Sequence, residues 1–148
     1  MEEIKEKAIN NFRGGLNCAQ SVITAYSEKL NADKKLLMSA SCGFGGGMGR
    51  LQETCGAVTG SFMVIGIYNC NKYSENNDRK EFSYKMIQDF DAQFKAIHGT
   101  TNCKALLKCD LNTIEGRQYV KDNGLHETIC EKCITDSVDI LEELMKTD

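Results

Sequence analysis

The chain has 148 residues, of which 41% are hydrophobic, and this size and composition suit one domain over 1–148 with an ordinary buried core. The net charge of −3 comes without any basic run, so no nucleic-acid partner is expected. No apolar run approaches the roughly 18 residues that a membrane span requires, and the N-terminus carries no apolar leader, so we expect a cytoplasmic protein without membrane insertion.

Three helices are predicted in the first third of the chain from apolar residues at helical spacing: 4–12, 18–30 and 34–40. The first ends at Gly14, as helices commonly do at glycine. The second begins after Asn17, and Gln20, three residues later, completes a capping-box pattern. The third is expected to start after Asp33, a residue type that favours the N-cap.

Most of the 13 glycines lie within residues 43–66, in a loop and in the helix that follows it. This helix is predicted over 55–68, with Thr54 as its N-cap. It is apolar nearly all round, which is typical of a central, buried helix. Gly56 and Gly60 leave a flat side along which another backbone can approach closely.

Further along, a long amphipathic helix is predicted over 78–98, ended by Gly99, and its stripe of aromatic residues is interpreted as core. Asn102 is expected to cap a short helix that ends near Lys108. A loose polar segment follows. Thr128, with Glu131 three residues later, predicts a capping box at the start of the last helix.

No run of residues alternates between apolar and polar with the period of two that a strand requires. The chain is therefore predicted to be all-α, a compact bundle of about six or seven helices around the Gly/Ala-rich helix 55–68. No internal repeat, linker or low-complexity segment divides it.

The chain contains eight cysteines, and a reducing cytosol favours metal-binding or catalytic thiols over structural disulfides. Four of them share a setting in the first turn of a predicted helix: Cys18, Cys55, Cys103 and Cys130. Unpaired N–H groups and the helix dipole there favour the thiolate and lower a thiol pKa that is ordinarily about 8.5. The recurrence favours a joint functional site over small core residues.

Cys130 and Cys133 form a CxxC pair, which suits vicinal-thiol redox chemistry or half of a metal site. No histidine follows the pair, so haem attachment is not expected. His126 lies nearby, but it fits a surface position better than a ligand role. The remaining cysteines have no comparable setting: Cys42, Cys70 and Cys109.

Repeated glycines before a helix can also form a phosphate cradle, in which backbone N–H groups bind an anion. It does not fit the GxGxxG pattern, because Met48 stands where the third glycine belongs, and no Walker lysine follows. Nucleotide binding is therefore not expected. A flexible or tightly packed loop that lets Cys42 and Cys55 approach the other thiols is the preferred interpretation.

Several stretches together resemble the C_GCAxxG_C_C family of redox-active proteins: NCAQSV at 17–22, GFGGGMGRLQETCGAVTGSFMVIG at 43–66, a cysteine at 103 and VDILEEL at 138–144. The similarity covers nearly the whole chain, and its centre is the signature CGAVTG. It implies four redox thiols: Cys18, Cys55, Cys103 and Cys133. For the last of these, the helix-start argument prefers Cys130, and the CxxC pair allows either.

The resemblance implies a redox protein, an oxidoreductase or an electron carrier, that works with a redox partner protein. The clustered thiols would act as a thiol/disulfide couple or as ligands of an iron–sulfur cluster. The ligands would come from five cysteines, with two glycines close to the cofactor: Cys18, Cys55, Cys103, Cys130, Cys133, Gly56 and Gly60. Alternatives are a structural zinc site on the same thiolates, and a non-redox module that assembles through the Gly56/Gly60 face, which also allows a homodimer.

Overall fold

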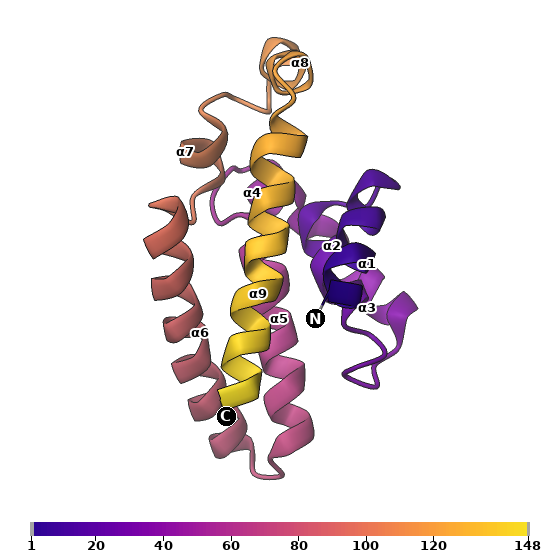
Figure 1. The fold of residues 1–148 in the computed structure, drawn as a ribbon, viewed down its shortest axis with the longest axis vertical. Helices are drawn as coiled ribbons and strands as arrows, with labels where there is room; N and C mark the ends of the chain where they lie inside the picture. Colours follow the sequence, from indigo (N-terminus) through magenta and orange to yellow (C-terminus); the bar gives the residue numbers. More distant parts are fainter. Residues whose placement is uncertain (1, 148) are drawn as a thin grey trace.

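The computed structural model describes residues 2–147, in which helices joined by turns and loops make up the fold and no strand occurs (Figure 1). The helices are α1 (Glu2–Arg13), α2 (Cys18–Ala25), α3 (Lys34–Ala40), α4 (Gly45–Met48), α5 (Gly56–Lys72), α6 (Asn76–His98), α7 (Cys103–Leu107), α8 (Ile114–Asp122) and α9 (Glu131–Thr147). A 3₁₀ turn, η1 (Cys42–Phe44), precedes α4, and a π-helical turn, η2 (His126–Cys130), precedes α9. The all-α prediction is confirmed. Met1 and Asp148, the ends of the predicted domain, lie outside the described residues.

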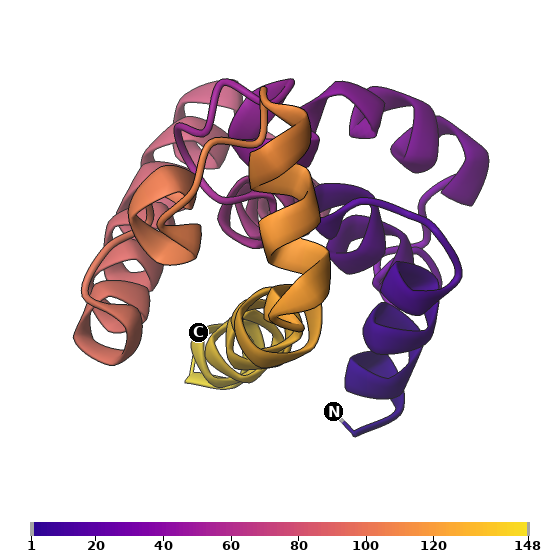
Figure 2. The same ribbon diagram turned by 90° about the horizontal axis from the view of Figure 1, so that it is seen from above.

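Three long helices, α5, α6 and α9, lie side by side along the long axis of the molecule (Figures 1 and 2). On the other side of α5 and α9, α2 packs against α5 and α1 packs against α9, while α3 contacts α2. The short helices α7 and α8 lie at the end where α9 begins. Within residues 2–147 no helix has the length and apolar character needed to cross a bilayer.

The core is formed by apolar side chains from all the long helices and from α2. Its largest fully buried members are Tyr26, Phe90, Phe94, Ile23, Ile65, Ile134 and Leu141. Each phenylalanine, isoleucine or leucine of this set contributes about 1.5–3 kcal/mol when it leaves water. The aromatic stripe of α6 is core as predicted at Phe90 and Phe94, but Phe82 and Ile97, nearer the helix ends, are exposed.

The local capping signals that the sequence carries are mostly confirmed. Asn17 and Gln20 form the predicted capping box at the start of α2. Asp33 accepts hydrogen bonds from the first turn of α3, and Asn102 accepts one from α7. Gly99 ends α6 with φ +81, in the left-handed region where glycine is favoured. These termini are therefore decided by residues within a few positions of each other.

Other boundaries differ from the prediction. Thr54 is not the N-cap of α5, because its segment pairs in an extended conformation with the segment before α7, through a bridge to Asn102. Cys55 is the N-cap residue instead, and α5 continues past the predicted end at Tyr68 to Lys72. The helix α2 ends at Ala25, earlier than predicted, where the chain passes into tighter turns.

The segment expected to be loose and polar contains a helix, α8. It is capped by Thr113, whose hydroxyl accepts a hydrogen bond from the Gly116 N–H. The pattern was missed because most of its side chains face solvent. The predicted capping box of Thr128 and Glu131 is absent, since the chain enters α9 through η2, and Thr128 donates back to the Gly124 carbonyl instead.

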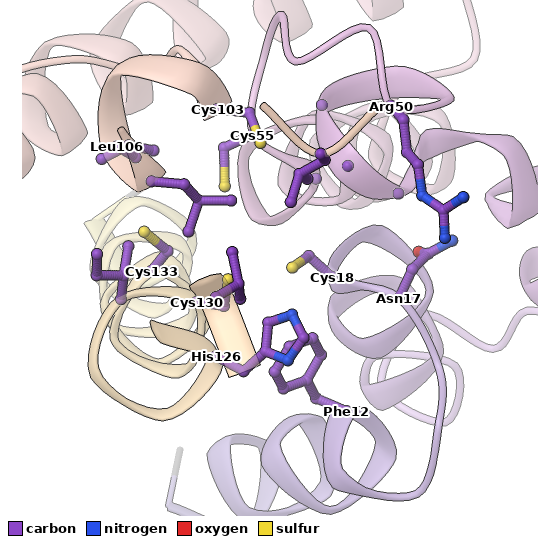
Figure 3. A pocket seen from close by; sticks show the side chains of 18 of the residues that line it. Phe12, Asn17, Cys18, Arg50, Cys55, Cys103, Leu106, His126, Cys130 and Cys133 are labelled. Carbon is purple, nitrogen blue, oxygen red and sulfur yellow. The ribbon is translucent and has the colours of Figure 1, made fainter. Parts of the chain in front are cut away.

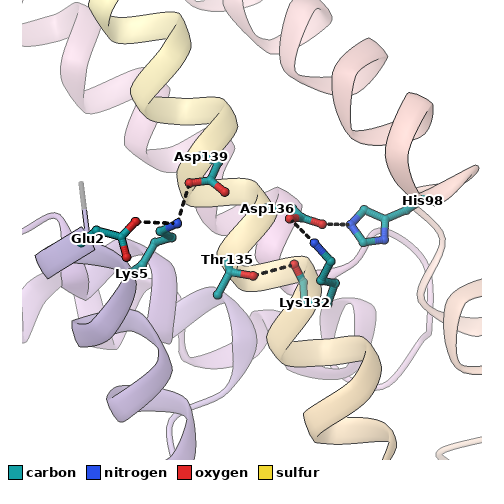
Figure 4. A network of polar contacts seen from close by, with 7 residues as sticks. All are labelled: Glu2, Lys5, His98, Lys132, Thr135, Asp136 and Asp139. Carbon is teal, nitrogen blue, oxygen red and sulfur yellow. Dashed lines mark hydrogen bonds and ion pairs between the residues drawn. The ribbon is translucent and has the colours of Figure 1, made fainter.

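Polar contacts tie α9 to its neighbours on two sides (Figure 4). Lys5 of α1 bridges to Asp139 at 3.0 Å. On the opposite side, the buried carboxylate of Asp136 lies 2.9 Å from the His98 ring at the end of α6 and 2.7 Å from the ammonium of Lys132. These contacts fix the rotation of α9, which carries the CxxC pair.

Candidate functional site

Two segments pair directly before α5 and α7, and this pairing brings two cysteines together. The N–H of Cys55 donates to the carbonyl of Thr101 at 2.8 Å, and the N–H of Cys103 donates to the carbonyl of Glu53 at 2.6 Å. The two helices therefore start side by side. Both cysteines stand at these helix starts, as the sequence predicted.

The glycines of α5 allow α2 to approach it closely. A Cβ added to Gly56 would lie 2.9 Å from the Cβ of Cys18, and one added to Gly60 would lie 2.8 Å from the carbonyl oxygen of Ala19. Contacts this short leave no space for a side chain, so glycine is required for this helix packing. The flat face predicted on α5 is thus covered by α2 of the same chain and offers no surface to a partner or a second copy.

The CxxC pair lies where η2 passes into α9. Cys130 is the last residue of η2, and Cys133 lies in the first turn of α9. Because η2 leads directly into α9, Cys130 does not occupy the free helix start that the capping argument assigned to it. Single π-helical turns occur frequently at functional sites.

These elements enclose a cavity of about 910 Å³. Six cysteines line it: Cys18, Cys42, Cys55, Cys103, Cys130 and Cys133. Figure 3 shows the sulfur atoms of five of them, all but Cys42, facing a common space. Gly56 also lines the cavity, whereas Gly60 lies outside it against α2.

The other cysteines stand apart from this group. Cys42 reaches the cavity wall but is exposed to solvent, and Cys70 is exposed near the end of α5. Cys109 is half-buried outside the cavity. The structure thus brings together all five thiols that the sequence singled out and adds Cys42 at the edge.

Cys55 and Cys133 form one hydrogen-bonded thiol pair. The bond from the Cys133 thiol lowers the pKa of Cys55, and the backbone N–H groups of Ala57 and Val58 add to this effect against the opposing influence of burial. The same bond, together with burial, raises the pKa of Cys133. When the pair loses its first proton, the negative charge is therefore biased toward Cys55 and the remaining proton toward Cys133.

Cys18 and Cys130 form a second hydrogen-bonded pair, and this bond together with burial raises the pKa of Cys18. Burial raises the pKa of Cys103 to about 12. The expectation of a lowered pKa at helix starts is therefore confirmed for Cys55 and wrong for Cys18 and Cys103. At Cys18 the hydrogen bond with Cys130 and then burial outweigh the helix dipole, and at Cys103 burial does so.

The glycine-rich loop forms one wall of the cavity through an unusual backbone conformation. Five consecutive residues have positive φ: Gly46 (+62), Gly47 (+66), Met48 (+69), Gly49 (+61) and Arg50 (+60). This left-handed turn costs roughly 1–2 kcal/mol for each residue that is not glycine. A Cβ on Gly47 would also lie 2.6 Å from the Cβ of Cys103, so the loop needs glycine to pass beneath that thiol.

Gln52 is a site residue that the sequence analysis missed. It is buried, and its amide donates to the Cys109 carbonyl at 2.8 Å and accepts from the Leu111 N–H at 2.9 Å. Its side chain also hydrogen-bonds to Cys103. The residue connects the glycine-rich loop to the segment after α7. A lone glutamine in a loop carries no sequence signal for this role, because its partners are distant in the chain.

Among residues 2–147 no group of three His, Cys, Asp or Glu side chains is arranged to hold a metal ion. The thiols around the cavity are instead arranged as two hydrogen-bonded pairs with Cys103 beside them. The iron–sulfur cluster and the zinc ion stay predictions.

The fold and the site define a small all-α protein with a cysteine-lined cavity at the starts of several helices. A family model described as "Putative redox-active protein (C_GCAxxG_C_C)" matches residues 16–144 of this chain. The chain belongs to this family, which confirms the resemblance drawn from its motifs. No curated protein and no solved structure matches the chain.

Proposed function

We propose that this protein carries out thiol–disulfide exchange, with Cys55 as the attacking thiolate and Cys133 as the resolving thiol. The observation that supports this assignment is the hydrogen bond between the two thiols, which lowers the pKa of one and raises that of the other. Thiolates and not thiols attack disulfides, so the bias makes Cys55 the nucleophile. Such chemistry suits the reducing cytoplasm, where these thiols start reduced.

The reaction proceeds in two steps. The Cys55 thiolate attacks one sulfur of a substrate disulfide, forms a mixed disulfide and releases the other half of the substrate as a thiolate, which takes a proton from water. Cys133, whose pKa falls once Cys55 no longer carries a charge, loses its proton to water and attacks the Cys55 sulfur as a thiolate. The second substrate thiolate leaves and takes a proton from water. The substrate disulfide is reduced to two thiols by two electrons, and Cys55 and Cys133 are oxidised to a disulfide.

The ambiguity within the CxxC pair is resolved in this proposal by the partner of each thiol. Cys133 contacts Cys55, whereas Cys130 contacts Cys18. Cys133 therefore resolves the mixed disulfide. The Cys18–Cys130 pair lies next to the first pair in the same cavity and provides a second dithiol for passing electrons onward.

The proposal is tested by mapping the disulfide formed in one oxidation. The reduced protein is treated with one equivalent of a small disulfide under anaerobic conditions, and peptides are analysed by mass spectrometry. The expected result is loss of two thiols and a link between Cys55 and Cys133. Cys55→Ser should abolish this link, while Cys70→Ser, a change at an exposed thiol on the same helix, should leave it intact. Inert thiols, or a first disulfide elsewhere, would refute the assignment.

A second candidate is an iron–sulfur cluster held by the same thiols for electron transfer. It is supported by the convergence of five cysteines on one cavity, since thiolates are the usual ligands of such clusters. A zinc ion on the same thiolates is the corresponding non-redox candidate. Anaerobic purification discriminates among them: bound iron with broad visible absorption selects the cluster, and colourless stoichiometric zinc selects the structural site. The remaining candidate is a non-redox module that assembles through the Gly56/Gly60 face. It is not supported, because α2 of the same chain covers this face.

A further inference from the structure

The reactive thiols lie deep in the molecule, which restricts what can reach them. The exposed fraction is 7% for Cys55 and 1% for Cys133. Both line the cavity of about 910 Å³, a volume within the range of small-molecule sites. A disulfide on the surface of a folded protein would need to unfold locally to enter. The recess therefore favours a small substrate.

The charges around the cavity are separated into two groups. On one side, Arg13 pairs with Glu131 through two hydrogen bonds of 2.8 and 3.0 Å. The negative charge of Glu127 also attracts the Arg13 guanidinium and raises its pKa. Arg13 is therefore fully neutralised by the two glutamates, and no positive charge is left on this side for a ligand. On the other side lie Arg50 and Arg117, and within the described residues neither has a carboxylate partner.

Arg50 and Arg117 are held by the same short segment. The side-chain amide of Asn112 donates to the carbonyl of Arg50 at 2.8 Å, and the guanidinium of Arg117 donates to the carbonyl of Leu111 at 2.6 Å. Arg50 also keeps its backbone at φ +60, a strained conformation for an arginine that surrounding contacts must maintain. Figure 3 shows its guanidinium beside Asn17, on the side of the cavity near Cys18. Two cations are thus available at one side of a thiol cavity in a chain whose net charge is −3.

The remaining walls are apolar and provide a place for the uncharged part of a ligand. Leu106, Leu111 and Ile129 line the cavity, and Phe12 packs edge-on against His126 with ring centroids 5.7 Å apart. A ligand that fits this lining has an apolar or sulfur-containing middle and charged ends. Arginine binds carboxylates, as it binds phosphates, through paired hydrogen bonds.

We propose that the substrate is a low-molecular-weight disulfide that carries carboxylates, bound with its carboxylates toward Arg50 and Arg117 and its sulfurs toward Cys55. This inference rests on the proposed thiol–disulfide exchange and specifies its substrate class. The reaction is the two-step exchange described above, with the small disulfide reduced to two thiols and Cys55 and Cys133 oxidised.

The test measures single-turnover oxidation of Cys55 by stopped-flow, with oxidised glutathione and with its fully esterified form. The two share a skeleton and a disulfide, but esterification removes the carboxylate charges. The free acid is expected to react about tenfold faster at low salt, and the preference should shrink as ionic strength rises, because exposed charges are screened. Equal rates for the two forms in the wild-type protein would overturn the proposal.

The double variant Arg50→Gln/Arg117→Gln should bring the ratio of the two rates close to one. Lys34→Gln/Lys35→Gln, which removes two exposed cations at the start of α3, is the matched control and should keep the wild-type ratio. A ratio that is unchanged in the arginine variant would also overturn the proposal. The comparison of substrates in the wild-type protein stands whether or not the variants fold.

The outcomes separate this inference from the function on which it rests. If no disulfide oxidises Cys55, thiol–disulfide exchange itself is wrong. If both small disulfides react equally well, exchange holds and the substrate class is wrong. A folded protein with a surface disulfide serves as the third probe. Oxidation by that protein as fast as by oxidised glutathione would refute the size restriction.

Discussion

Gly60 and Gly66 lie on the same helix, α5, but in different surroundings. A Cβ at Gly60 would lie 2.8 Å from the carbonyl oxygen of Ala19 and 3.1 Å from the Cα of that residue, whereas a Cβ at Gly66 would have no heavy atom within 4 Å. Replacement by alanine removes the same backbone freedom at both positions and favours the helix by about 1 kcal/mol. The two variants should therefore differ through the contact with α2 alone.

Gly66→Ala is expected to raise the free energy of unfolding by about 0.5–1 kcal/mol. In Gly60→Ala the same gain is offset by overpacking, which typically costs about 1–3 kcal/mol. The neighbouring atoms belong to the backbone of α2 and cannot move away as a flexible side chain would. Gly60→Ala should accordingly be about 1–3 kcal/mol less stable than Gly66→Ala, well within the roughly 5–15 kcal/mol that holds a domain folded.

Urea unfolding of the reduced proteins, followed by far-ultraviolet circular dichroism, measures this difference. Midpoints are compared at a common m-value, so that a change in midpoint reports stability. If Gly60→Ala is as stable as Gly66→Ala, α2 does not pack on α5 as described. The close approach that brings Cys18 to the cavity would then be wrong as well.

Two further predictions concern ionisable groups. Burial raises the pKa of Cys103 from 9.0 to about 12, so its contribution to stability should be complete below about pH 9 and be lost as the pH rises toward 12. Urea unfolding at several pH values in this range should show that the free energy of unfolding falls less steeply with pH in Cys103→Ala than in the wild-type protein. An identical slope in the two proteins would contradict the raised pKa. Asp136→Asn should lower the free energy of unfolding by about 1–3 kcal/mol, because the buried carboxylate accepts from Lys132 and faces His98. Asp139→Asn, which breaks a more exposed pair on the same helix, should cost less than about 1 kcal/mol in the same assay, and equal losses would argue against the buried network.

Local signals predicted the helices well where a few neighbouring residues decide the outcome. Asn17, Asp33 and Asn102 each cap a helix, because their side-chain oxygens need only an amide two or three residues away. Thr54 carries the same signal and fails, since its segment pairs with a distant one. The helix α8 was missed because Gly116 and Val120 are its buried residues, too few for a periodic pattern.

The candidate site shows the same division. The sequence placed five thiols near helix starts or in the CxxC pair, and all five line one cavity. It did not identify Gln52 or the left-handed turn that begins at Gly46, because both act through contacts with the segment after α7 or with Cys103. Nor did it separate the partners of Cys130 and Cys133, which are Cys18 and Cys55.

By itself the sequence determined the all-α class, the family and the group of thiols that belong together, because periodicity, caps and motifs are properties of neighbouring residues. Tertiary structure alone decided that Cys55 pairs with Cys133 and Cys18 with Cys130. These pairs cross helix interfaces, and the pKa of each thiol depends on its partner and on its removal from water more than on its own helix. For that reason the pKa is lowered at Cys55 but raised at Cys18 and Cys103, although the three thiols share the same local signal.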